Sequence, residues 1–418
     1  MPEPRAQPTR GGGIRINRSD AIFSMAIVPI FLVLAILDVV TPTGQPLTPL
    51  TGALSYGFKT ALGAGVFLLG SLTLFRARLP FIFRLAVLLY VAVVLFWFMS
   101  WMTGPTRGDA TTFLTNPYFS VWSWLMILVV PITITFNGRG LLTEAIAKIP
   151  VPPLVGALII AEAVETIQRW GINLASAAVG ILFIVACRTR YTLRSRISAA
   201  ITALILAVVM ALGGYRIYSL AFSIFAISYV AIPRYNRPVF ILSTLLLICT
   251  PILYVQFKDV VSETLSSEDG PIAQDTRSFL FTELFDDFSP SEVALGRGLN
   301  GTYYSPYFAY IAQHDASSVG QNNIWRTGSE VSWLNMILKL GLIGLIPFMT
   351  ALLTPVFLRQ RNQLSVLPID GMQRFVPMII LIFAAELPNQ ISVSYFSWYI
   401  CIGTLIVGSY SRVGTSSE

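Results

Sequence analysis

The sequence predicts an all-α polytopic integral membrane protein with about twelve transmembrane helices. Three observations carry this prediction. The chain of 418 residues has a mean hydropathy of +0.70, and only 12% of its residues are charged. Apolar runs close to the roughly 20 residues that cross a bilayer recur along nearly the whole chain. The basic residues gather in alternate connections between these runs.

The predicted spans are the apolar runs at 21–40, 52–75, 80–101, 118–136, 150–167, 172–187, 196–213, 215–233, 238–257, 330–357, 374–391 and 392–410. They divide the chain into a tail at 1–20, nine helices within 21–257, a large loop at 258–329, three helices within 330–410 and a second tail at 411–418.

The basic residues orient the chain. Of the 28 lysines and arginines, 19 fall in the two tails and in the connections on the same side as the tails. Seven fall on the other side. Because positive charge is retained on the cytoplasmic side, both termini are predicted to be cytoplasmic and the large loop extracytoplasmic.

The large loop of about 72 residues between the ninth and tenth spans is acidic, with ten acidic and four basic residues. Its stretch TRSFLFTELFDDF places Phe279, Leu280, Leu284 and Phe288 at helical spacing, which predicts a short amphipathic helix on the outer membrane surface. The following segment YYSPYFAYIAQH is rich in tyrosine. A loop of this length usually has a function.

Residues 296–301, GRGLNG, match the glycine pattern G-x-G-x-x-G of dinucleotide-binding turns. That pattern requires a preceding strand and a following helix, whereas here it lies in a loop outside the membrane. Nucleotide binding is therefore not expected. Two interpretations remain: a flexible turn, or a pair of glycines that present Arg297 to a ligand and let it approach closely.

Ionisable residues within membrane spans are functional candidates because a charge is costly there. In the predicted orientation these residues all lie in the outer half of the membrane: Asp38, Lys59, Glu162, Glu165, Arg169, Arg216, Glu330, Lys339 and Glu386. This placement predicts a cavity that opens outward beneath the large loop. Structural ion pairs are the alternative, since Glu165 and Arg169 are four residues apart and share a helix face.

Arginines in and around the loop are the candidate ligands of an anionic head group, because the guanidinium grips phosphate in a bidentate manner and stays charged. They are Arg169, Arg216, Arg277, Arg297 and Arg326. Arg277, Arg297 and Arg326 could each instead form a surface salt bridge with the many acids of the loop. The sequence contains no metal-binding constellation, and we expect no metal and no cofactor.

Three segments resemble the superfamily of O-antigen ligases and polymerases. ALGGYRIYSLAFSIFAI has an arginine that opens a span after a small-residue turn, ALGRGLNG is similar to the glycine-rich part of the large loop, and GSEVSWLNMILKLGLIGLIPF is similar to the run that follows it. Arg169 and Gly180 also show the R-x10-G spacing of some Wzy-type polymerases. Ligases carry a histidine where this chain has Glu330. The single histidine of the chain, His314, lies about sixteen residues earlier, and this difference favours a polymerase.

The resemblance implies transfer of a glycan from undecaprenyl pyrophosphate to the sugar of a second lipid-linked repeat unit, in the bacterial inner membrane with the active site facing the periplasm. The arginines would hold the pyrophosphate, and Glu330, His314 or Glu165, in that order, would be the base. The implied partners are the lipid-linked oligosaccharide, membrane lipid and a chain-length regulator, with no nucleic acid. An O-antigen ligase and a lipid-linked glycan transporter or flippase remain the alternatives.

Overall fold

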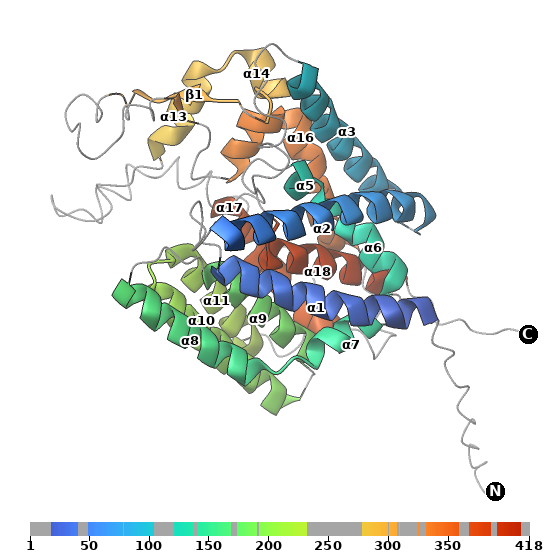
Figure 1. Ribbon diagram of the computed structural model, residues 1–418, viewed down its shortest axis with the longest axis vertical. Helices are drawn as coiled ribbons and strands as arrows, with labels where there is room; N and C mark the ends of the chain where they lie inside the picture. The colour runs from blue at the N-terminus through green and yellow to red at the C-terminus, as the bar shows by residue number, and fades with distance from the viewer. Residues whose placement is uncertain are drawn as a thin grey trace, which may run out of the picture.

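The computed structural model of the protein describes residues 18–40, 49–77, 79–103, 121–137, 140–168, 174–189, 192–231, 278–299, 301–306, 309, 325–326, 332–358, 368–385 and 391–410. Within these ranges the chain forms a bundle of α-helices and one small antiparallel sheet (Figure 1). The predicted ninth span at 238–257 lies outside the described residues, as do most of the two tails.

The first half of the bundle follows the predicted apolar runs. Its helices are α1 (Arg18–Val40), α2 (Pro49–Arg76), α3 (Phe81–Thr103), α5 (Val121–Trp124), α6 (Val129–Phe136), α7 (Leu141–Ala147), α8 (Val151–Gln168), α9 (Leu174–Arg188), α10 (Leu193–Leu212) and α11 (Arg216–Ala231). A 3-10 turn at Leu125–Leu128 joins α5 to α6, so the run predicted at 118–136 is one continuous helical segment of two helix types. The short helix α7 occupies a predicted connection.

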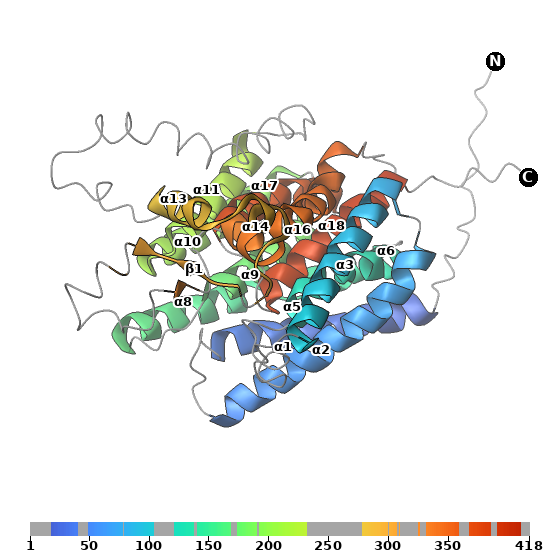
Figure 2. The same cartoon turned by 90° about the horizontal axis from the view of Figure 1, so that it is seen from above.

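The second half contains a cap and three long helices. The cap consists of α13 (Ser278–Asp287), α14 (Pro290–Leu295), β1 (Tyr303–Tyr304) and β2 (Trp325–Arg326). The helices are α16 (Ser332–Phe357), α17 (Ile369–Ala385) and α18 (Val393–Tyr410). α3 packs along α16, as both views show (Figures 1 and 2). α1 and α2 lie at the lower edge of the bundle in Figure 2.

Burial separates an inner from an outer set of helices. Nearly every described side chain of α9 and α18 is buried, whereas α1, α2, α3, α8 and α10 expose many large apolar side chains. Ile22, Met25, Leu68, Phe75 and Leu212, for example, are each at least 58% exposed. Exposed apolar surface on this scale is incompatible with water and indicates helices that face lipid.

Helix length and apolarity together give a lower number of membrane-spanning helices than the twelve predicted. Four described helices are long and apolar enough to cross a membrane, namely Gly52–Arg76, Phe81–Trp101, Leu193–Leu212 and Ser332–Phe357. The number rises to five if the bent pair Val121–Phe136 and Leu141–Ala147 counts as one span. The structure thus confirms an all-α, membrane-embedded protein. The twelve spans and their orientation stay predictions.

Two arginines close the C-terminal end of α11. Arg196 of α10 donates to the carbonyl oxygen of Tyr229, and Arg374 of α17 donates to that of Ser228. The last carbonyls of a helix lack intrahelical partners and carry partial negative charge, so cations are favoured there. Arg374 also pairs with Asp370 one turn earlier in α17, with Nε–Oδ2 at 3.0 Å, and its guanidinium lies 4.8 Å from the centroid of the Tyr229 ring.

Candidate functional site

The cap over α16 holds the GRGLNG motif. α13 and α14 meet at Phe288 and Ser289, where Ser289 and Glu292 form a capping box and Pro290 occupies the first turn of α14. Leu284, Phe288 and Tyr303 are buried against Leu334 and Leu338 of α16. The apolar residues Leu284 and Phe288 of the predicted amphipathic helix therefore cover the helix bundle, whereas the sequence led us to expect them on the membrane surface.

Arg297 lies at the centre of the cap. Its Nε donates to Glu292 Oε1 at 2.8 Å and its Nη1 to Asp287 Oδ2 at 2.5 Å and to the Thr302 carbonyl at 2.8 Å. Its Nη2 donates to the Asp287 carbonyl at 2.6 Å and to Glu292 Oε2 at 3.3 Å. A guanidinium has five N–H donors, so all of them are used within the chain. The group also lies 4.4 Å from the centroid of the Phe288 ring.

The electrostatics of the cap follow from these contacts. Hydrogen bonds from Arg297 and then from the backbone and hydroxyl of Ser289 lower the pKa of Glu292 to about 2. Burial lowers the pKa of Arg297, but its hydrogen bonds to Glu292 and Asp287 outweigh this effect, so the pKa is raised overall. Both groups are therefore ionised at neutral pH. We call Arg297, Asp287 and Glu292 the arginine clamp.

The glycines of the motif allow close packing. Gly296 has φ +78, and a Cβ atom there would lie 2.6 Å from the Gly341 nitrogen of α16. Gly298 has φ +84, and its Cβ atom would lie 2.9 Å from the Trp97 ring of α3. Residues other than glycine rarely adopt such φ angles, and any side chain would collide with these helices. The turn is therefore docked onto α3 and α16.

Hydrogen bonds fix the same turn to the bundle. α16 is interrupted at Gly341, which has φ +65, and the Arg297 N–H donates to the Leu338 carbonyl beside this break at 2.8 Å. The buried Lys339 donates from Nζ to the Gly301 carbonyl at 2.7 Å, and Trp97 donates from Nε1 to the Leu295 carbonyl at 3.0 Å. Structural ion pairs were the alternative for the ionisable residues of the spans, but the partner of Lys339 is this backbone carbonyl.

Arg216 belongs to a different part of the molecule. It is the first residue of α11, follows the turn Gly213–Gly214–Tyr215, and its side chain is exposed. Glu162 of α8 lies against this turn, since a Cβ atom on Gly213 would be 2.5 Å from its Oε1. In the part of the chain that the structure describes, no hydrogen bond or ion pair joins Arg216 to the cap.

The other predicted site residues are placed only in part. Arg326 is half-buried on β2, opposite Tyr303 of β1, and so belongs to the cap with Arg297. Glu165 lies in the last turn of α8, and its side chain is outside the described residues. Four further candidates also fall outside the described residues: Arg169, Arg277, His314 and Glu330.

Asp38 and Lys59 form a buried ion pair between α1 and α2. Lys59 Nζ lies 3.1 Å from Asp38 Oδ1, and both residues are buried. Asp38 Oδ2 accepts from the Ser176 hydroxyl at 2.8 Å and from the Val393 N–H at 2.7 Å. Because Val393 opens α18, the carboxylate caps that helix from another segment and joins α1, α2, α9 and α18.

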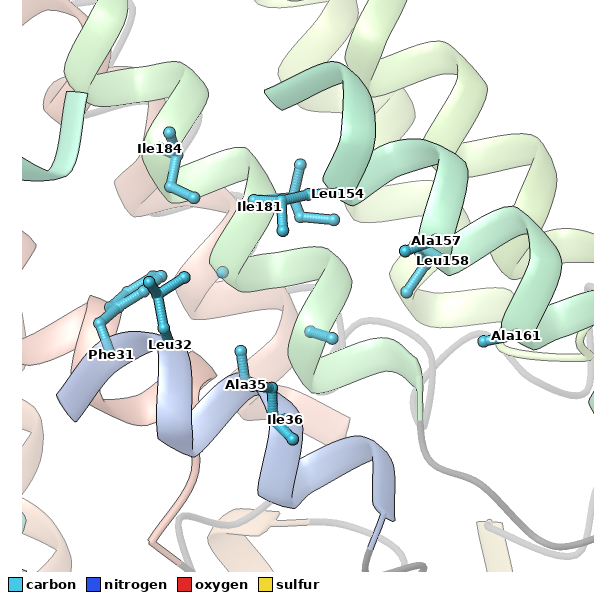
Figure 3. A pocket seen from close by; sticks show the side chains of 12 residues that line it. Phe31, Leu32, Ala35, Ile36, Leu154, Ala157, Leu158, Ala161, Ile181 and Ile184 are labelled. Carbon is cyan, nitrogen blue, oxygen red and sulfur yellow. The ribbon is translucent and has the colours of Figure 1, made fainter. Parts of the chain in front are cut away.

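An apolar cavity of about 340 Å³ lies between α1, α8 and α9 (Figure 3). It extends along all three helices, from Phe31 to Ile36 on α1, from Leu154 to Ala161 on α8 and from Ile184 to Ala177 on α9. Ile36 is 60% exposed, so the cavity reaches the outer surface of the bundle.

Three polar residues lie close in the chain to lining residues at one end of the cavity. In the chain, Ile36 is two residues from Asp38, Ala161 is next to Glu162, and Ala177 is next to Ser176. The lining itself is wholly apolar, and none of these three polar residues belongs to it. Such a lining suits an extended apolar chain.

No protein-family model matches the chain, and no curated protein matches it.

Proposed function

We propose that the protein is a polysaccharide polymerase that moves a growing glycan from undecaprenyl pyrophosphate to the acceptor sugar of a second lipid-linked repeat unit. It would act at the outer face of the bacterial inner membrane. The observation that carries the proposal is the cavity between α1, α8 and α9, which is lined by apolar residues along three helices. A polyprenyl chain is a long apolar tail, and such a lining suits it.

The chemistry follows from the activated donor. An acceptor hydroxyl oxygen attacks the anomeric carbon, the new C–O bond forms as the bond to pyrophosphate breaks, and the hydroxyl proton passes to a base. Undecaprenyl pyrophosphate leaves with the bonding electrons. This step consumes no nucleotide, and cations near the departing oxygen lower its barrier. Glu330 is our first candidate for the base, followed by His314 and Glu165.

The contacts of the arginines divide their proposed roles. Arg216 is exposed at the start of α11 and its side chain makes no hydrogen bond within the described residues, so it is our first candidate for the pyrophosphate ligand, together with Arg169 and Arg277. Arg326 is a weaker candidate. Arg297 could bind a phosphate only if it gave up its hydrogen bonds to the carboxylates of Glu292 and Asp287. We therefore assign it to holding the cap in place over α16.

Deletion of the gene followed by analysis of surface and lipid-linked glycans tests the proposal. Loss of a polymerase leaves single repeat units on the final acceptor. Long polymer that accumulates on the lipid carrier would identify a ligase, and loss of all glycan from the outer face would identify a flippase. Complementation with the Arg216→Ala variant at normal protein level separates loss of catalysis from loss of the protein.

A further inference from the structure

The small sheet of the cap presents two aromatic rings on one face. Tyr304 and Trp325 are cross-strand partners, their ring centroids are 5.5 Å apart, and their planes meet at 62°. Tyr304 is 37% exposed and Trp325 is 58% exposed. The rings form an open corner with a phenol hydroxyl and an indole N–H at its rim. We call these two residues the aromatic corner.

The corner is held rigidly. Tyr303, the neighbour of Tyr304, points to the opposite face and is fully buried against α13 and α16. The Tyr304 N–H donates to Asp287 Oδ2 at 3.2 Å, and the same oxygen accepts from Arg297. The Ser305 hydroxyl donates to the buried Glu283 at 2.7 Å. The arginine clamp therefore sets the position of the corner relative to α16.

We infer that the aromatic corner binds a pyranose ring of the lipid-linked glycan. The inference rests on the proposed function and extends it to a sugar-binding site. A pyranose has an apolar face of C–H groups and a rim of hydroxyls, which match an aromatic face and the polar atoms at its edge. Because strand pairing already orders both rings, binding costs little side-chain entropy.

The alternative is that the aromatic corner contacts the lipid head-group region, because tryptophan and tyrosine also gather at membrane interfaces. The surroundings of the corner favour a sugar. The backbone N–H of Tyr304 is bound to Asp287 of the arginine clamp, and the exposed Asp286 lies in the same cap. An exposed carboxylate hydrogen-bonds well to a hydroxyl-rich ligand, whereas contact with acyl chains would remove it from water at a cost.

Binding can be measured without turnover. The probe is the repeat-unit oligosaccharide released by mild acid from the lipid-linked glycan of expressing cells, titrated against the full-length protein in lipid nanodiscs and followed by saturation-transfer NMR. We expect Trp325→Ala and Tyr304→Ala each to raise Kd by about tenfold, and Trp325→Phe to retain most of the affinity. Phe285→Ala is the control, since Phe285 is a 41% exposed aromatic of the same cap that lies outside the sheet.

Unchanged affinity in both alanine variants overturns the inference, and so does an equal loss in Phe285→Ala. A nitroxide on Trp325→Cys tests the membrane alternative: relaxation by a water-soluble nickel chelate supports the sugar site, whereas relaxation by dissolved oxygen alone overturns it. The deletion phenotype reports on the polymerase separately. Normal polymer in the deletion strain rejects the proposed function, while the titration and the nitroxide still decide on the corner.

Discussion

The backbone N–H of Arg297 donates a 2.8 Å hydrogen bond to the carbonyl oxygen of Leu338, beside the break in α16. A break in a helix leaves carbonyls without their usual partner, and a buried carbonyl without a partner is costly. The turn of the cap supplies the missing donor. The cap and the break in α16 therefore depend on each other.

Gly341→Ala tests this dependence. The residue has φ +65, and a Cβ atom would lie 2.2 Å from the Ala294 carbonyl oxygen. We expect a loss of at least about 2 kcal/mol in stability, from the left-handed conformation and the collision together. Thermal unfolding in detergent measures it. Gly65→Ala in α2 is the control, because nothing lies within 4 Å of its Cβ position and its midpoint should not fall.

Variants of Arg216 and Arg297 should differ in phenotype, because we propose different roles for the two arginines. Arg216→Ala should lower polymer yield by about 100-fold with normal thermal stability, because it removes a ligand of the leaving group. Arg216→Lys should recover only part of the activity, since the fork is lost. Arg297→Lys should instead expose the cap to limited proteolysis. Equal stability and equal yield in these variants would argue against the division of roles.

The arginine clamp should loosen in acid. The pKa of Glu292 falls from 4.5 in the unfolded chain to about 2 in the fold. Its contribution to stability is therefore complete above pH 4.5 and is lost as the pH falls from 4.5 towards 2. The protection factors of the backbone amides of α14, which correct the exchange rate for its intrinsic pH dependence, should fall across that window. In Glu292→Gln these protection factors should be low already at pH 7 and should depend less on pH.

The fold should tolerate the loss of Lys59 from the buried Asp38–Lys59 pair better than the loss of Asp38. Lys59→Met removes one partner of Asp38, whereas Asp38→Ala leaves Lys59, Ser176 and the Val393 N–H without an acceptor. Breaking a buried pair typically costs about 3–5 kcal/mol, and we expect Asp38→Ala at the upper end or beyond. A double-mutant cycle by thermal unfolding measures the coupling. Additive single losses would mean that the pair contributes nothing as a pair.

Filling the cavity should stop polymerisation without unfolding the protein. Ala157 lines the cavity from α8, so Ala157→Trp should displace a polyprenyl tail and raise the KM for lipid-linked substrate. Ile160 is 67% exposed on the same helix and lies outside the cavity, which makes Ile160→Trp the matched control. An equal KM in both variants, measured with purified donor and acceptor, would remove the cavity from the proposal.

The helices could be predicted from the sequence because bilayer-length apolar runs are a local property. The role of Arg297 could not, because its partners depend on how α13, α14 and the turn fold together. Asp287 and Glu292 were visible only as members of an acidic loop. The spacing of Ser289 and Glu292 is a capping-box signature, and it could have indicated α14 and the position of that carboxylate in advance.

Two features of the structure could not be predicted from local sequence patterns. Asp38 and Lys59 are 21 residues apart on separate helices, and only the packing of α1 against the others brings them together. The break at Gly341 falls inside an apolar run that looks continuous, GLIGLIPF. A glycine within an apolar span has no distinctive hydropathy, so only its contact with Ala294 and Gly296 shows why it is needed.

The arginines at the end of α11 serve two purposes with the same atoms. Arg196 and Arg374 belong to the charge asymmetry from which the orientation of the chain is predicted, and both hydrogen-bond to the final carbonyls of a neighbouring helix. A topology experiment that relocates these charges would also remove the hydrogen bonds that hold α10 and α17 to α11. An inverted or degraded product would then report on lost packing as much as on orientation, so such experiments should use the exposed Arg188 or Arg194 instead.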